Sequence, residues 1–376
     1  MKHWHFIDNL TKVNCIIMVN QRVWSLIFLS AQIPSAKVSP KNVPVAIVNE
    51  DSSSMGEMIQ GMLLQNAPEA VKLIPYDSVE AMQEGMKQRE TYAGLVIPAN
   101  YSAQIQSLQT EAPEAAVLNI HINEGANATV AATMETNLKG IAAGISANVS
   151  AQIMQGLQGA GVPISADKVT LLANPVTTNI VKENAVGKLG SVPSALFVPV
   201  WISSLLGAIM LYFAGNKRSF KDRKELLSFQ LIQSVIPIIY GFFVGYVVTW
   251  YSTWVLGYEF DSFNNVAILM SLAVISFVYM ILSLVSWLKL PIIAVFALLM
   301  FFGLPLIQLI PEMLPSFYSD CILPWLPFRY LTEAFKELLY FGEGVINIYS
   351  GVLLGIAIGG FILLWIKNLL IKPSNS

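Results

Sequence analysis

Five long apolar stretches in the second half of the chain constrain its fold more than any other feature. They run from Val192 to Phe213, Leu231 to Leu256, Val266 to Leu288, Pro291 to Ile310 and Ile346 to Ile366. Each is near the ~20 residues that a helix needs to cross the hydrocarbon core of a bilayer. Only 12% of all residues are charged, against about 25% in soluble domains. The sequence therefore predicts an integral membrane helical bundle and excludes a soluble enzyme.

A sixth and weaker candidate span lies near the start of the chain, from Ile16 to Ile33. Asn20, Gln21 and Arg22 interrupt it, and only Val23 to Leu29 is a continuous, mostly apolar run. We interpret the segment as a short first span, because Arg22 lies close enough to one end to reach the headgroups. An interfacial helix or a signal-like segment is the alternative. With this span the bundle has about six helices that cross the membrane.

The distribution of Lys and Arg predicts the orientation of the spans. If the spans alternate, ten basic residues fall on one side, and only Arg329 and Lys336 fall in the short segments on the other. The ten are Lys2, Lys12, Lys217, Arg218, Lys221, Arg223, Lys224, Lys289, Lys367 and Lys372. The positive-inside rule then places both termini in the cytoplasm. We expect a cytoplasmic helix and first span at 1–34, an extracytoplasmic domain at 35–190 and a five-span domain at 191–376.

The region between the first and second spans alternates strand-like and helical patterns. The expected strands are Val43–Val48, Val71–Pro75, Tyr92–Ile97 and Val117–Ile122, and the expected helices are Met55–Gln65, Val79–Arg89 and an Ala-rich run at Ala126–Leu157. This alternation predicts an inserted α/β domain with a long helix. The acidic and hydroxyl residues at Asn49–Ser54 indicate a strand-to-helix turn with capping groups. A polar stretch from Asn174 to Gly190 is expected to lead back to the membrane.

Motifs for catalysis and cofactor binding are missing from the sequence. The pair Gly187–Lys188 lacks the glycine five positions earlier that a phosphate-binding loop requires, so this chain is not expected to hydrolyse ATP. The histidines His3, His5 and His121 form no zinc-protease motif. We therefore expect no catalytic residue, no metal site and no cofactor bound by this chain. The near balance of 22 basic and 24 acidic residues gives no reason to expect a nucleic-acid partner.

The five predicted spans contain no Asp, Glu, Lys, Arg or His. Ion-coupled carriers usually keep such a residue within the bilayer to bind the driving ion. A transporter with these spans would instead receive energy from another polypeptide, most simply an ATPase on the cytoplasmic face. The basic segment Asn216–Phe229 is the candidate docking site, although topology alone also favours a basic loop there. The candidate coupling residues are Phe220, Lys221, Arg223, Glu225 and Leu226.

Two further patterns concern helix packing near the end of the chain. Gly351, Gly355 and Gly359 recur at every fourth position, which lets another helix approach closely, from a second subunit or from the same chain. Before them, proline residues break up a segment at about 311–344 that predicts a re-entrant, amphipathic hairpin at the outer interface. The apolar face of its helix consists of Phe328, Leu331, Phe335 and Leu338.

The order of these features resembles that of the permease subunit of bacterial type-2 ABC exporters, and more narrowly that of the YhgE/Pip membrane proteins. The resemblance spans nearly the whole chain. Three segments carry it: VPVAIVNED at Val43–Asp51, YAGLVIPANYS at Tyr92–Ser102 and LPFRYLTEAFKELLYFGEG at Leu326–Gly344. The chain departs from the family pattern at its first span, which Asn20–Arg22 shorten.

This resemblance implies a homodimer or heterodimer of permeases in a bacterial plasma membrane. Separate ATPase subunits would bind ATP and energise the export of a hydrophobic or amphipathic substrate. In such exporters an N-terminal cytoplasmic helix and the loop after the second span contact the ATPase, and these correspond here to Trp4–Thr11 and Phe220–Leu227. The alternative function is a membrane-anchored surface protein, such as a phage receptor or secretion accessory, whose outer domain binds a partner without transport.

Overall fold

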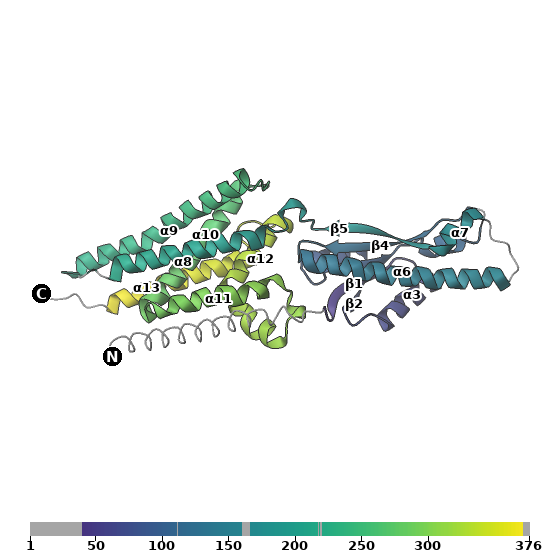
Figure 1. Cartoon of the computed structure of the whole chain (residues 1–376), viewed down its shortest axis with the longest axis horizontal. Coiled ribbons are helices and arrows are strands. Elements are labelled where there is room, and N and C mark those ends of the chain that lie inside the picture. Colours follow the sequence, from purple (N-terminus) through teal and green to yellow (C-terminus); the bar gives the residue numbers. More distant parts are fainter. Residues whose placement is uncertain (1–39, 111, 160–165, 217, 219, 371–376) are drawn as a thin grey trace, which may run out of the picture. The chain divides into compact units, whose positions relative to one another are not determined.

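A computed structural model describes residues 40–110, 112–159, 166–216, 218 and 220–370 (Figure 1). The chain divides into two compact units. The membrane unit contains Pro193–Phe335 and residues 344–370, and the sheet unit contains residues 40–192 and Lys336–Glu343. The expected first span at Ile16–Ile33 and the expected ATPase contact at Trp4–Thr11 lie outside the described residues.

The sheet unit contains one five-stranded sheet in the order β2-β1-β3-β4-β5. Its strands are β1 (Val43–Asn49), β2 (Val71–Tyr76), β3 (Ala93–Ile97), β4 (Ala116–Asn123) and β5 (Val176–Glu183). Strand β1 pairs in parallel with β2 and β3, β4 is antiparallel to β3, and β5 is parallel to β4. The four expected strands are present, which confirms the α/β interpretation. Strand β5 was missed, because its many polar residues give it only a weak hydrophobic pattern.

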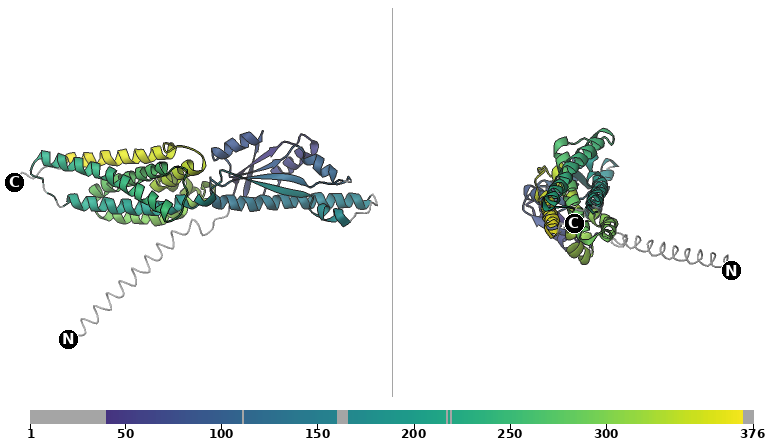
Figure 2. Two further views of the ribbon diagram at one scale, coloured as in Figure 1. Left: turned by 90° about the horizontal axis from the view of Figure 1, so that it is seen from above. Right: turned by 90° about the vertical axis from the view of Figure 1, so that its left-hand side faces the viewer.

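Five helices connect the strands of the sheet unit. They are α3 (Ser54–Gln65), α4 (Val79–Lys87), α5 (Tyr101–Ser107), α6 (Ala128–Gly159) and α7 (Ala166–Ala173). Met82 and Met86 of α4 pack on Ala46, Val48 and Val96 of the sheet. The long helix α6 packs against β3, β4 and β5, and Figure 2 shows it along one face of the sheet with purple helices on the other side. The expected long helix is therefore present and helps to bury the sheet.

The buried carboxylate of Asp51 lies just after β1 and bonds to Ser102, which follows β3 in the chain. In doubly wound sheets, ligands bind between two neighbouring strands whose following connections leave in opposite directions. In this sheet the chain passes from β1 to β2 on one side and from β3 to β4 on the other. Here Asp51 Oδ2 accepts hydrogen bonds from the Ser102 backbone N–H, at 3.0 Å, and from the Ser102 hydroxyl. Its Oδ1 accepts the Ser53 N–H at 3.0 Å. Ser53 in turn caps α3 by accepting the Gly56 N–H at 3.3 Å, which confirms the expected capping turn.

The segment Lys336–Glu343 clusters with the sheet unit, although the sequence places it in the hairpin before the last span. The ion pair between Arg89 Nη2 and Glu337 Oε1 is 3.0 Å long, and both side chains are only 15% exposed. The Arg89 guanidinium also lies 4.6 Å from the centre of the Phe341 ring. Tyr340 donates its hydroxyl proton to the carbonyl oxygen of Leu189 at 2.7 Å. These contacts fix the segment against the sheet unit.

The membrane unit contains five helices that are long and apolar enough to cross a bilayer. They are α8 (Val192–Asn216), α9 (Arg223–Trp254), α10 (Phe263–Leu288), α11 (Pro291–Gln308) and α13 (Ile348–Leu370). They run alongside one another in Figure 1. All five spans expected from the sequence after residue 190 are thus confirmed as helices. Between α11 and α13 lie short turns at Pro311–Met313, Phe317–Ile322 and Leu323–Trp325, followed by α12 (Pro327–Tyr340).

Helix α10 is the central helix of the membrane unit, because α9 and α13 both pack closely on it. A β-carbon on Gly245 of α9 would lie only 2.6 Å from the backbone nitrogen of Ser271. On the other side, a β-carbon on Gly360 of α13 would lie 2.7 Å from the backbone carbon of Tyr279. Only glycine permits backbones to approach this closely. Three serines of α10, Ser271, Ser276 and Ser283, donate their hydroxyls to backbone carbonyls, and Ser276 does so to Leu353 of α13 at 2.7 Å.

The apolar face of α12 is buried inside the chain rather than lying free at a membrane interface. Phe328, Leu331 and Phe335 are fully buried, whereas Leu338 is half-buried. Phe328 packs in an aromatic cluster with Phe197, at a centroid distance of 4.7 Å, and with Trp201, at 5.3 Å. Three of the four residues of the expected apolar face are therefore packed in the core of the membrane unit. The re-entrant position of the hairpin at the outer interface stays a prediction.

The glycine stripe of the last span does not pack within the described chain. Hypothetical β-carbons on Gly351, Gly355 and Gly359 meet no atom of it within 4 Å. The close contact inside the membrane unit is made by the neighbouring Gly360 instead. Sequence reasoning missed Gly360, because the regular four-residue spacing drew attention to the other three glycines.

Replacing Asp51 by Asn should weaken the sheet unit locally. The change removes a charge that accepts three hydrogen bonds, and hydrogen bonds to charged groups contribute about 1.5–3 kcal/mol. We expect amide hydrogen exchange in β1, β3 and α5 of the full chain to accelerate at least tenfold at pH 7. Glu50→Gln is the matched control, because Glu50 is exposed. Equal exchange in the two variants would contradict this role.

Acid should reproduce the effect of that substitution. Burial alone raises the pKa of the Asp51 carboxyl, but hydrogen bonds from Ser102 and Ser53 outweigh burial and hold the pKa below its ordinary value. The stabilisation is therefore fully present above about pH 4, the unfolded pKa, and is lost as the pH falls through the lower folded pKa. Urea unfolding followed by circular dichroism should show a loss below pH 4 that is smaller in Asp51→Asn.

Replacing Gly360 by Ala should separate α13 from α10. The added methyl group meets the backbone of Tyr279 and Met280, and overpacking of this kind typically costs about 1–3 kcal/mol. We expect a lower thermal unfolding midpoint for the full chain in detergent, measured by tryptophan fluorescence. Gly355→Ala is the control and should unfold like the unmodified chain, because its methyl group has open space. Equal midpoints for the two variants would refute the close packing.

Candidate functional site

Five helix ends lie at one end of the membrane unit: the end of α8, the start of α9, the end of α10, the start of α11 and the end of α13. Helices α8 and α9 are joined by a short loop. Gln230 near the start of α9 donates to the Trp365 carbonyl of α13 at 3.5 Å. Trp287 near the end of α10 donates its indole N–H to the Leu363 carbonyl at 3.1 Å. The basic residues at these ends therefore share one end of the bundle, as the alternation of spans requires.

Arg218 organises the loop between α8 and α9. Its guanidinium lies 5.5 Å from the ring centre of Phe229 and 6.0 Å from that of Phe220. The two ring centres are 5.3 Å apart, and Arg218 Nη2 lies 3.2 Å from Glu225 Oε1. Exposed cation–π contacts contribute about 0.5–1 kcal/mol, and exposed ion pairs about as much or less. We name Arg218, Phe220, Glu225 and Phe229 the Arg218 cluster; together their contacts favour one arrangement of these four side chains.

The same loop contains a reciprocal cap for helix α9. Asp222 is the N-cap residue, and its Oδ1 accepts the Glu225 N–H at 2.8 Å. Glu225 Oε2 accepts the Lys221 N–H at 3.0 Å. The first interaction satisfies a backbone N–H that a helix start leaves without a partner, and the second ties Lys221, the residue before the N-cap, to the same glutamate. Sequence reasoning did not use Asp222, although an acidic residue followed three positions later by Glu is a capping signal.

The five candidate coupling residues fall into two groups in the structure. Phe220 and Glu225 belong to the Arg218 cluster, and Leu226 is only 4% exposed. Lys221 and Arg223 are exposed. Phe220, Glu225 and Leu226 therefore make contacts within the chain. Lys221 and Arg223 leave their charges accessible to solvent. Lys224 and Leu227, which is 39% exposed, extend this accessible surface.

Ser234 lies further along α9 and is the centre of a hydrogen-bond network that joins α9, α10 and α13. The Trp365 indole of α13 donates to Ser234 Oγ at 2.8 Å, and the Tyr279 hydroxyl of α10 donates to the Ser234 carbonyl. Ser234 donates its own hydroxyl proton to the Gln230 carbonyl at 2.8 Å. Hydrogen bonds between membrane helices contribute about 0.6 kcal/mol on average. The network therefore links the start of α9 to the core of the bundle.

Several polar residues of the spans bond to their own helices. Ser204, Thr249 and Ser252 donate to carbonyls four residues earlier, at 2.7 Å, 2.8 Å and 2.7 Å. All three are buried. Ser203 likewise donates to the Pro199 carbonyl at 2.6 Å. These contacts give the hydroxyls a structural role.

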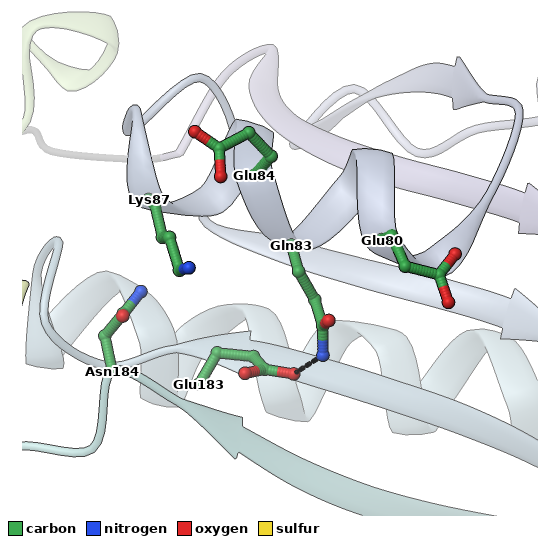
Figure 3. A pocket seen from close by; sticks show the side chains of 6 residues that line it. All are labelled: Glu80, Gln83, Glu84, Lys87, Glu183 and Asn184. Atoms are coloured by element: carbon green, nitrogen blue, oxygen red, sulfur yellow. Dashed lines mark hydrogen bonds between the residues drawn. The ribbon is translucent and has the colours of Figure 1, made fainter.

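The sheet unit contains a polar pocket of about 330 Å³ between α4 and the end of β5 (Figure 3). Glu183 at its floor accepts a hydrogen bond from Gln83 Nε2 at 2.9 Å and lies 2.8 Å from Nδ1 of the buried His121. The pocket is lined by Glu80, Gln83, Glu84, Lys87, Glu183 and Asn184. Three carboxylates and one ammonium group suit a small polar ligand with a positive charge. Sequence reasoning missed this pocket, because β5 itself was missed.

Among the described residues, no group of three or more His, Cys, Asp or Glu could hold a metal ion. The geometry of the chain thus offers a basic, preorganised loop at one end of a five-helix bundle and a polar pocket in a separate α/β unit.

Three comparisons with known proteins concern the family to which the chain belongs. A crystal structure of a domain assigned to an ABC type-2 transporter from Thermotoga maritima MSB8 is 19% identical and covers 37% of this chain and 86% of that chain. Its TM-score of 0.23 is too low to carry a structural argument. The search of curated proteins gives no match. Residues 23–366 match the family model described as ABC-2 family transporter protein. Because that model covers most of the sequence, the chain belongs to the ABC-2 family of transporter proteins.

Proposed function

We propose that this chain is the permease subunit of an ABC exporter, which moves a hydrophobic or amphipathic substrate out of the cell. Membership of the ABC-2 family supports the permease role, since this family forms the membrane component of ABC transporters. Export, the substrate class and the identity of the ATPase are our proposals. The narrower resemblance to YhgE/Pip proteins stays a prediction, because the family match concerns the broader group.

The position of charged residues in the described membrane helices favours an external source of energy. Arg223, Lys224 and Glu225 lie in the first turn of α9, and Lys367 lies near the end of α13. The middle of each of the five described helices carries no ionisable Asp, Glu, Lys, Arg or His. A driving proton or ion would need such a group within the bilayer. ATP hydrolysis by a separate subunit is the simplest alternative.

The preorganised loop at the start of α9 is the observation that carries the docking proposal. The Arg218 cluster and the Asp222 cap hold residues 220–225 against the start of α9, so that Lys221, Arg223 and Lys224 are presented on a defined surface. Preorganisation lowers the entropy lost on binding. The Ser234 network connects this surface to α10 and α13. A movement of the ATPase could thus be transmitted into the bundle.

We further propose that the basic end faces the cytoplasm of a bacterial cell, with both termini on that side and the sheet unit outside. The excess of basic residues at this end supports the orientation through the positive-inside rule. We also propose a dimer of permeases, either homo- or heterodimeric. The open surface of Gly351, Gly355 and Gly359 supports a contact with a second permease, because their β-carbon positions meet nothing in the described chain.

Reversing the charge of the exposed coupling residues should release the ATPase. In the double variant Lys221→Glu/Arg223→Glu the loop keeps its cluster and cap, but electrostatic attraction to an acidic partner surface becomes repulsion. We expect at least a tenfold loss of the ATPase that co-purifies with the tagged chain from native membranes, measured by quantitative mass spectrometry. Lys72→Glu in the sheet unit is the control for charge, since Lys72 is also exposed.

Three outcomes separate the hypotheses. Loss of the ATPase in the double variant alone supports docking at this loop. An ATPase that stays bound in the double variant contradicts docking there but keeps the permease role. If the unmodified chain retains no ATPase and instead retains an extracellular partner, the alternative function as a surface-binding protein replaces the exporter.

The dimer is tested by the substitution Gly355→Leu. A larger side chain at this open position should disturb a contact between subunits by about 1–3 kcal/mol, as overpacking does, without disturbing the fold of one chain. We expect the dimer fraction in detergent, measured by mass photometry, to fall while the thermal unfolding midpoint of the monomer stays the same. An unchanged dimer fraction would place the subunit contact elsewhere.

A further inference from the structure

The ends of α10 and α13 are held at the same level by contacts along both helices. Ser276 of α10 donates to the Leu353 carbonyl of α13 at 2.7 Å. Further along both helices, Trp287 donates to the Leu363 carbonyl at 3.1 Å. The contacts advance together along the two sequences, so the helices run in the same direction and end side by side. The residues that follow these contacts must therefore share one membrane boundary.

Two lysines occupy this shared end. Lys289 is the residue directly after α10, and Lys367 lies near the end of α13. Because Trp287 and Leu363 are joined by a hydrogen bond, Lys289, two residues after Trp287, and Lys367, four residues after Leu363, lie at the same end of the two helices. Neither lysine forms an ion pair with another residue in the described part of the chain. We name Lys289 and Lys367 the lysine pair.

Lys289 has a backbone conformation that a residue with a side chain rarely adopts. Its φ of 67° lies in the left-handed region, where a helix end usually has glycine. A side chain in this conformation costs energy that glycine avoids. Backbone strain of this kind is a reason to ask what the side chain does. Here it places a second positive charge at the end of the bundle that Lys367 also occupies, although like charges repel.

The surface next to the lysine pair is apolar and open. Leu288 is 56% exposed, and Leu363 and Ile366 are 43% and 44% exposed. Trp287 is also exposed, and its indole N–H is already bonded to the Leu363 carbonyl. On helices that cross a membrane, such side chains face hydrocarbon, and tryptophan prefers the level of the headgroups. The surface thus combines two cations at the boundary with an apolar wall beneath them.

We propose that the lysine pair binds the phosphate of an anionic glycerophospholipid, whose acyl chains lie against Leu288, Leu363 and Ile366. The phosphate offers the counter-charge that the described chain does not supply, and it relieves the repulsion between the two ammonium groups. Basic residues next to membrane helices attract anionic lipids in this way. A bound lipid would also hold the ends of α10 and α13 together. The site depends on the membrane location of these helices and not on docking of an ATPase.

The apolar wall distinguishes a lipid from a soluble anion. A free phosphate would gain only the charge interaction, which salt screens at an exposed surface. A lipid adds contacts between its acyl chains and the exposed leucine and isoleucine side chains, and the bilayer supplies it at high local concentration. The site therefore selects anionic over zwitterionic headgroups, and phospholipid over inorganic phosphate.

Native mass spectrometry of the full chain in detergent tests the proposal by titration with two lipids that share the same acyl chains. Dioleoyl phosphatidylglycerol should bind at least tenfold more tightly than dioleoyl phosphatidylcholine. Each lysine should contribute about fivefold to this preference, so Lys289→Gln/Lys367→Gln should abolish it. Lys221→Gln/Lys224→Gln removes the same charge at the same end of the bundle and should keep the preference.

A second variant distinguishes loss of lipid binding from loss of folding. Lys289→Gly removes the cation but suits the left-handed backbone, so this variant should fold at least as well as the unmodified chain and still lose about fivefold in preference. Lys367→Arg keeps the charge and should retain binding. An unchanged preference in the double Gln variant, or one that falls equally in the Lys221/Lys224 control, would overturn the site. Full competition by millimolar inorganic phosphate would identify a soluble anion as the ligand instead.

Discussion

The close packing of α9 and α13 on α10 is the constraint on which the membrane unit depends. Gly245 and Gly360 bring two backbones to the surface of α10, where a β-carbon would meet main-chain atoms at 2.6 Å and 2.7 Å. In a bilayer no hydrophobic effect drives helices together, so this contact and the interhelical hydrogen bonds must hold the bundle. The Ser234 network supplies such bonds at the basic end. Packing and polar contacts thus place the loop before α9 and the lysine pair at one boundary.

Much of the fold could be predicted from the sequence, because its strongest signals are long and regular. The spans after residue 190 follow from hydropathy, and the first four strands follow from buried runs such as Val43–Val48. Strand β5 was missed, since residues such as Thr177 and Asn179 give its exposed side a polar pattern. The placement of Lys336–Glu343 was also missed, because it depends on tertiary contacts of Glu337 with Arg89, far away in the sequence.

The candidate site could be located from the sequence but not resolved into roles. The basic segment before α9 stands out by composition, and its position at one end of the bundle agrees with the structure. The pattern could not reveal that Leu226 is buried or that Phe229 stacks with Arg218, because both depend on how the loop folds back on the helix. For the glycine stripe, the sequence predicted a contact that the described chain does not contain. The spacing of its three glycines indicates close packing, yet their β-carbon positions are open, and Gly360 makes the close contact with α10 instead.

The central claim is that a separate ATPase binds at the loop before α9. Photo-crosslinking in native membranes tests it most directly, with the crosslinking residue at position 227 or, as the control, at position 325. Leu227 and Trp325 are both exposed, at 39% and 83%, and lie at opposite ends of the membrane unit. The account predicts an adduct with a nucleotide-binding subunit at position 227 and none at position 325. An adduct with that subunit only at position 325, or at neither position, would contradict it.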